Sequence, residues 1–206
     1  PPRHLPPSDP GRRVIHALVV GLGNPGKEYA RTRHNVGEEA VGILAERFGE
    51  RLKAGRDRAL VADARMGEHR VVLAFPTTYM NESGNAVGAL MRRHHLTDPR
   101  QLVVVHDELD LPPGVVKVKV GGGLAGNNGL RSITQHLKTQ DYVRVRIGIG
   151  KPPHKEQGAD FVLKRLTGPA RTAVELDVAA AADAIELILD VGLTVAQQQV
   201  NAGMRG

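Results

Sequence analysis

Patterns typical of strands alternate with patterns typical of helices along almost the whole chain. Residues 14–20 and 101–106 are short apolar runs, which predict buried strands. Residues 36–48 and 171–189 carry apolar side chains at helical spacing, which predicts an amphipathic helix in each segment. Because strands that alternate with helices pack as a sheet covered on both faces, we expect an α/β fold.

Two further pairs of strands indicate that this sheet is mixed. Residues 59–64 and 70–75 flank a turn at 66–68, as in an antiparallel hairpin. Residues 115–120 and 143–149 alternate apolar with polar side chains. The expected fold class is therefore a single α/β domain with a central mixed, twisted sheet flanked by helices on both faces.

The sequence also suggests where several helices begin and end. Ser83 is expected to cap a helix that runs to about residue 95, and Thr194 to cap a short final helix. Gly192 is expected to end the long helix before it. Another helix is expected at 130–137, after a glycine-rich turn.

Composition divides the chain into a short tail and one domain. Residues 1–13 contain five prolines and no periodic pattern, so we expect a flexible Pro-rich tail before a single domain at 14–206. No apolar run reaches the roughly 18 residues that a membrane helix needs. Cysteine is absent, which excludes disulfides, a thiolate nucleophile and a cysteine zinc site and fits a cytoplasmic protein.

The glycine-rich segment after the first strand allows a dinucleotide-binding alternative. Residues 21–26, GLGNPG, have the G-x-G-x-x-G spacing. However, Pro25 favours a turn where a dinucleotide site needs the start of a helix, and the next helical pattern begins near Val36. Glu46, which stands where an acidic residue would bind the ribose, lies inside that helical pattern. A dinucleotide oxidoreductase is therefore the weaker alternative.

Polar side chains suited to hydrolysis gather at the expected ends of strands, where ligands bind in open α/β sheets. A neutral imidazole can take a proton from water near pH 7, and a carboxylate can fix its tautomer. Amide groups can hold the water or a developing oxyanion. Such a set favours ester hydrolysis without a metal or a covalent intermediate. The candidates are His34 as base, Asp107 as orienting carboxylate, and the amides Asn24, Asn81 and Asn128.

Each candidate also has a purely structural interpretation. A single histidine in a loop is more often structural, Asn is common in turns, and Asp107 could cap a turn in HDELDLPPG. Their joint position at the ends of strands favours a catalytic role over a structural one.

Cationic side chains form a second cluster, and the net charge of +6 suggests a polyanionic partner. The alternation in 115–120 and 143–149 places two cations on one face of each strand. The cluster could be a solvated sheet rim or a phosphate clamp beside the glycine-rich loop. Between residues 117 and 146 the cations are Lys117, Lys119, Arg131, Lys138, Arg144 and Arg146, against the single acid Asp141.

Five motifs in order resemble the bacterial peptidyl-tRNA hydrolase family. They are GLGNPGKEYARTRHNVG (21–37), PTTYMNESG (76–84), HDELDLPPG (106–114), GGGLAGNNGLRSI (121–133) and RVRIGIGKP (144–152). The resemblance implies a monomeric, metal-free enzyme of translation and ribosome rescue, without a cofactor, that cleaves the ester between peptide and tRNA.

The same resemblance assigns roles to individual residues. It implies that His34 is the catalytic base and that Asp107 orients it. It also implies substrate and tRNA contacts: Asn24, Asn81 and Asn128 at the ester and peptide end, Tyr29 near the tRNA 3′ end, Tyr79 at the substrate, and Lys119 with Arg146 on the 5′ phosphate.

One position departs from the family pattern. The family usually has G-H-N-G where this chain has Gly126-Asn127-Asn128-Gly129, and Asn127 cannot titrate as a histidine can. An RNA-binding protein without catalysis remains an alternative from another class. Retention of His34, Asp107 and the three matched Asn residues argues against it.

Overall fold

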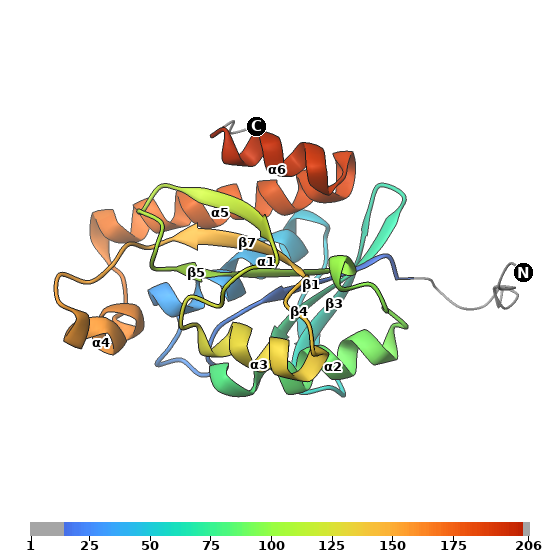
Figure 1. Ribbon diagram of the computed structural model, residues 1–206, viewed down its shortest axis with the longest axis horizontal. Helices are drawn as coiled ribbons and strands as arrows, with labels where there is room; N and C mark the ends of the chain where they lie inside the picture. The colour runs from blue at the N-terminus through green and yellow to red at the C-terminus, as the bar shows by residue number, and fades with distance from the viewer. Residues whose placement is uncertain (1–14, 204–206) are drawn as a thin grey trace, which may run out of the picture.

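A seven-stranded sheet runs through residues 15–203, the part of the chain that the computed structural model describes (Figure 1). Its strand order is β2-β3-β4-β1-β5-β7-β6. Strands β4, β1, β5 and β7 are parallel, whereas β2, β3 and β6 are antiparallel to their neighbours at the two edges. The predicted mixed α/β sheet is therefore confirmed. The strands are β1 (Ala17–Gly21), β2 (Lys53–Ala54), β3 (Ala59–Met66), β4 (His69–Pro76), β5 (Leu102–Glu108), β6 (Val116–Val120) and β7 (Val143–Gly148).

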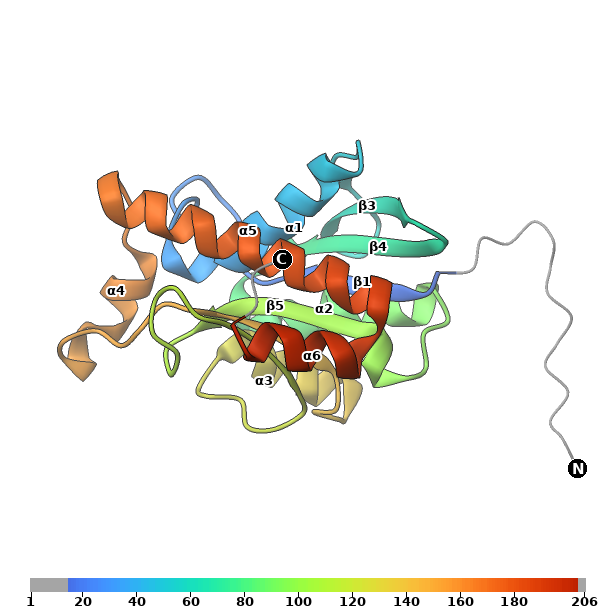
Figure 2. The same ribbon diagram turned by 90° about the horizontal axis from the view of Figure 1, so that it is seen from above.

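Helices cover both faces of the sheet (Figures 1 and 2). On one face lie α1 (Val36–Arg47), α5 (Gly168–Val191) and α6 (Leu193–Asn201). On the other lie α2 (Ser83–Arg93) and α3 (Asn128–Leu137), which pack against each other. The short helix α4 (Gly158–Leu163) lies beyond the carboxyl end of β7 (Figure 1). Within residues 15–203, four single-turn 3₁₀ helices connect these elements: η1 (Arg33–Asn35), η2 (Met80–Glu82), η3 (Pro99–Gln101) and η4 (Lys155–Gln157).

The core consists of two apolar layers, one on each face. Alternation along β5 shows the division, because Val103 and Val105 pack toward α1 and α5 while Leu102 and Val104 pack toward α2 and α3. All four side chains are almost completely buried. The central strands are therefore apolar on both faces, as expected for parallel strands covered twice.

Two glycines let the start of α1 lie directly on the sheet. A Cβ on Gly21 would come within 2.2 Å of the Gly37 carbonyl oxygen. A Cβ on Gly37 would come within 2.2 Å of the Val105 carbonyl oxygen. No side chain fits either gap, so this contact sets the position of α1 and of the 3₁₀ turn η1 just before it.

Most predicted elements are confirmed to within a few residues, but the two predicted hydroxyl caps are wrong. Ser83 is the first residue of α2, and its hydroxyl donates to the Met80 carbonyl oxygen at 2.8 Å. Thr194 lies inside α6, where Gly192 holds the N-cap position. Gly192 does end α5, with a φ of 89° that suits glycine.

Two expectations concern the chain as a whole. The predicted tail at 1–13 lies outside the described residues, so its boundary with the domain stays a prediction. Among the helices of residues 15–203, none is long and apolar enough to cross a membrane.

Candidate active site

The predicted site residues converge beyond the carboxyl ends of β1, β4 and β5. β1 leads into the loop that holds Asn24, and β4 leads into the loop before η2. The third strand, β5, extends to Glu108, two residues further than predicted, so Asp107 lies inside a strand and caps no turn. The purely structural interpretation of Asp107 as a turn cap is therefore wrong. η1 brings His34 to the same edge.

His34 and Asp107 are hydrogen-bonded to each other. The His34 Nδ1 atom lies 2.9 Å from Asp107 Oδ2. Only 19% of the His34 side chain and 4% of the Asp107 side chain are exposed. Burial alone would lower the pKa of His34, but the hydrogen bond and the negative charge of Asp107 outweigh it, so the pKa is raised above its ordinary value. With Nδ1 engaged, Nε2 is the nitrogen that can accept a proton.

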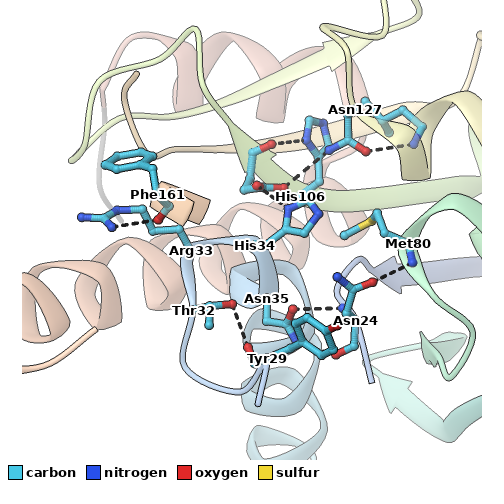
Figure 3. Close-up of polar contacts among 12 residues, drawn as sticks. Asn24, Tyr29, Thr32, Arg33, His34, Asn35, Met80, His106, Asn127 and Phe161 are labelled. Atoms are coloured by element: carbon cyan, nitrogen blue, oxygen red, sulfur yellow. Dashed lines mark hydrogen bonds and ion pairs between the residues drawn. The ribbon is translucent and has the colours of Figure 1, made fainter. Parts of the chain in front are cut away.

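Asn35, the residue after His34, fixes the loop that holds Asn24. Its side-chain oxygen accepts a hydrogen bond from the Asn24 backbone N–H at 2.9 Å. Its Nδ2 donates to the Asn24 carbonyl at 2.8 Å and to Glu38 Oε2 at 2.7 Å. The Asn24 side-chain oxygen in turn accepts from the Met80 backbone N–H at 2.7 Å (Figure 3). The Asn24 side chain therefore joins the loops after β1 and β4, and the bond from Met80 to its oxygen directs its NH₂ group away from Met80.

The remaining amide candidates lie at the starts of two adjacent helices. Asn81 belongs to η2, which leads into α2, and Asn128 is the first residue of α3; both are exposed. η2 packs against the start of α3, where Met80 lies over Gly129. Tyr79 is 58% exposed, and Tyr29 is half-buried in the loop that leads to His34. All four residues therefore border the edge that carries His34.

Asn127, which the sequence marked only as a departure from the family pattern, is a neighbour of the His34–Asp107 pair. Its Nδ2 lies 3.5 Å from Asp107 Oδ1, on the side of the carboxylate away from His34. The sequence signal for this contact was the position of Asn127 immediately before α3. The side chain of an N-cap residue has a fixed direction, because it bonds to a backbone N–H in the first turn of its helix. The two adjacent asparagines, Asn127 and Asn128, thus have different surroundings.

The cations of β6 and β7 share one face of the sheet. Lys117 pairs with Arg146 and Lys119 with Arg144 across the antiparallel strands, which makes Lys119 and Arg146 diagonal neighbours. Arg146 Nη1 is 3.7 Å from Glu108 Oε1, and the Lys119 amine lies against Gly122. The predicted pair therefore lies next to the glycine-rich loop.

Arg144 fits neither interpretation of the cationic cluster, the solvated rim or the phosphate clamp. It is 1% exposed, because the glycine-rich loop folds over it. Its guanidinium donates to the carbonyl oxygens of Gly122 at 3.1 Å and Gln140 at 3.2 Å, and also to that of Gly123. It also lies 4.8 Å from the centre of the Tyr142 ring. This arginine holds the loop in place and does not face a ligand.

Comparison with known proteins identifies the family. The sequence matches the family described as "Peptidyl-tRNA hydrolase" over residues 18–205. It is 52% identical to the peptidyl-tRNA hydrolase of Nocardia farcinica over 189 residues, 90% of this chain and 96% of that protein. The chain belongs to the peptidyl-tRNA hydrolase family.

Further relatives agree with this assignment. The peptidyl-tRNA hydrolase of Frankia casuarinae is 50% identical over 185 residues, which are 90% of this chain and 93% of that protein. The crystal structure of peptidyl-tRNA hydrolase from Acinetobacter baumannii superimposes with a TM-score of 0.85 at 36% identity, covering 93% of this chain and 98% of that one.

As a member of the peptidyl-tRNA hydrolase family, the chain is a carboxylic ester hydrolase connected with translation, as the sequence predicted. The weaker dinucleotide alternative is replaced by this assignment. The structure agrees, because the loop after β1 turns at Gly26 and α1 begins only at Val36. Within residues 15–203, no group of three or more His, Cys, Asp or Glu side chains is placed to hold a metal ion.

Proposed function

We propose that the protein hydrolyses the ester bond between peptide and tRNA, with His34 as the general base. The observation that carries this proposal is the hydrogen bond of 2.9 Å between His34 Nδ1 and Asp107 Oδ2. Asp107 fixes the tautomer in which Nε2 is free to accept a proton. Family membership supports the choice of substrate.

In the proposed reaction, Nε2 of His34 removes a proton from a water molecule while the water oxygen attacks the ester carbonyl carbon. The ester bond to the tRNA 3′ oxygen then breaks, and that oxygen takes up the proton from the imidazolium. The negative charge of Asp107 stabilises the imidazolium between these two steps. No covalent intermediate with the protein forms.

We assign the neighbouring amides to the substrate. The Asn24 NH₂ group, whose direction is set by the bond from Met80 to its oxygen, is suited to the ester or the adjacent peptide group. Asn81 and Asn128, exposed on adjacent helices, are suited to the peptide end and to the water or ester carbonyl. Tyr29 and Tyr79 offer rings to the tRNA end and to the substrate.

We assign Lys119 and Arg146 to the 5′ phosphate of the tRNA. Both lie on one face of the β6–β7 pair, near the glycine-rich loop that ends at Asn127. A phosphate bound there would release counterions and make binding sensitive to salt. We further propose that the enzyme acts in the cytoplasm as a monomer, without a metal or other cofactor, and frees tRNA and peptide after ribosome rescue.

The test measures release of peptide from a diacylaminoacyl-tRNA by purified protein. His34→Ala should lower kcat by on the order of 10²–10⁴-fold and should fold normally by circular dichroism. His69→Ala is the matched control, because His69 is exposed at the amino end of β4, at the opposite end of the strand from the site. Wild-type turnover by His34→Ala would refute the assignment of the base. Binding of the tRNA without release by the native protein would favour the RNA-binding alternative.

A further inference from the structure

Asn127 occupies a position where three interactions fix its direction. Its backbone N–H donates to the Leu124 carbonyl at 2.9 Å, and its own carbonyl accepts from the Arg131 N–H at 3.0 Å. Its side-chain Oδ1 accepts from the Leu130 backbone N–H at 3.0 Å, which makes it the N-cap of α3 (Figure 3). Both the backbone and the amide plane of Asn127 are therefore held by the first turn of α3.

This cap determines which end of the amide faces Asp107. Since Oδ1 is committed to the Leu130 N–H, the NH₂ group is the end that lies 3.5 Å from Asp107 Oδ1. The reverse orientation would direct an oxygen at the carboxylate and NH₂ at an N–H, and both contacts would be repulsive. The carboxylate thus has a donor on each oxygen, His34 on Oδ2 and Asn127 on Oδ1.

We propose that Asn127 is a positioning residue, which couples the start of α3 to the orientation of the Asp107 carboxylate toward His34. This inference rests on the proposed role of His34 as the base. Asp107 is almost completely buried, so few waters can replace a missing donor. Asn127 supplies that donor without adding a charge, and an amide does not titrate.

Other charged or titratable side chains lie next to Asp107 along β5. His106, also on β5, is buried, and its Nδ1 lies 2.7 Å from the Asp107 carbonyl oxygen. Burial lowers the pKa of His106, which keeps it neutral. Glu108 follows on β5 and pairs with Arg146 of β7. A substitution at position 127 therefore changes the charge near the His34–Asp107 pair only through residue 127 itself.

Two substitutions separate the cap from the donor. Ser and Asp cap helices about as well as Asn, so Asn127→Ser and Asn127→Asp should both preserve the start of α3. The Ser side chain is too short to reach Asp107. The Asp side chain places a second negative charge beside it, which favours the imidazolium form of His34. Thermal unfolding close to the native midpoint would show that the cap is intact.

The readout is the titration of the His34 ring by NMR, together with the pH profile of kcat/KM. For Asn127→Asp we expect the His34 titration and the acid limb of the profile to move upward by about 0.5–1 pH unit. For Asn127→Ser we expect kcat to fall about tenfold with KM unchanged, because the carboxylate is less well oriented. Gln135→Glu is the matched control, since it adds the same charge on the exposed side of α3 and should change neither readout.

The outcomes distinguish this inference from the proposed function. If Asn127→Ser keeps the native kcat and Asn127→Asp leaves the His34 titration unmoved, Asn127 is only a helix cap and the inference is wrong. The NMR titration does not depend on turnover. An upward shift in a protein that hydrolyses no peptidyl-tRNA would therefore contradict the proposed function while supporting the link between Asn127, Asp107 and His34.

Discussion

The guanidinium of Arg33 lies 4.1 Å from the centre of the Phe161 ring and donates to the Phe161 carbonyl oxygen at 3.2 Å. Arg33 directly precedes His34, and Phe161 belongs to α4. A second tie lies nearby, where the Leu166 N–H donates to the Arg31 carbonyl at 3.0 Å. The segment around α4 is thus attached to the turn that carries the proposed base (Figure 3).

Removal of the Arg33 side chain should loosen α4 without unfolding the sheet. A cation–π contact and one hydrogen bond contribute about 1–2 kcal/mol together, which suffices to increase local opening severalfold. In Arg33→Ala, hydrogen exchange should therefore become faster in α4 and stay unchanged in β5. Arg51→Ala, at an exposed arginine before β2, is the control. Exchange in α4 at the native rate would show that the Arg31–Leu166 tie is sufficient.

The activity should depend on pH through His34. The proposed base must be neutral, so kcat/KM should fall as pH drops through the pKa of His34, which Asp107 raises above its ordinary value. Asp107→Asn removes that charge, so the acid limb should move to lower pH while the plateau falls by on the order of 10²–10⁴-fold. An acid limb at the same pH in Asp107→Asn would mean that another group titrates.

The same pair should make folding stability depend on pH. Because the pKa of His34 is higher in the folded protein than in the unfolded chain, the pair stabilises the fold fully below the unfolded value of about 6.5. This contribution is lost as pH rises through the folded value. The difference in Tm between the native protein and His34→Gln should therefore be larger at about pH 5.5 than at about pH 9. An equal difference at both pH values would contradict the raised pKa.

The contact between α1 and the sheet predicts opposite effects at two glycines of one helix. Gly37→Ala should cost about 1–3 kcal/mol, since a Cβ there meets the Val105 carbonyl at 2.2 Å. Gly42→Ala should stabilise by about 0.5–1 kcal/mol, because nothing lies within 4 Å of its Cβ and alanine favours helix. Denaturant unfolding measures both. Gly37→Ala should also lower kcat, since the start of α1 would shift together with His34.

Salt dependence should reveal whether β6 and β7 bind a phosphate. In Lys119→Met, tRNA binding should weaken and the slope of log K against log salt should become less steep by about 1. Lys53→Met is the control, because β2 lies at the edge of the sheet opposite β6 and Lys53 is exposed. An unchanged slope in Lys119→Met would place the phosphate site elsewhere.

The fold followed from the sequence because burial on both faces leaves a clear pattern. The central strands carry apolar side chains on both faces along much of their length, as in residues 102–105 of β5, and the hairpin of β3 and β4 needs a turn, here at Gly67. Helix starts were less predictable. Ser83 has the right side chain for a cap, but the chain makes a 3₁₀ turn before it, which places Ser83 one residue inside α2.

The members of the proposed site could be named from the sequence, but their contacts could not. Alternation correctly placed Arg144 and Arg146 on one face, yet it could not show that the glycine-rich loop folds back over Arg144. Asn127 and Asn128 are adjacent and chemically identical, and only the start of α3 distinguishes them. Such differences depend on where loops pack, which spacing along the chain does not encode.

The proposed active site and the first described residue lie at opposite ends of the sheet. Ile15 leads into the amino end of β1, whereas Asn24, His34 and Asp107 lie beyond or at the carboxyl ends of β1 and β5. A surface or label attached ahead of Ile15 would hold the molecule by the end opposite the site. Immobilised in this way, the enzyme would present the edge that carries the proposed site to solution, which suits it to binding measurements on a sensor surface.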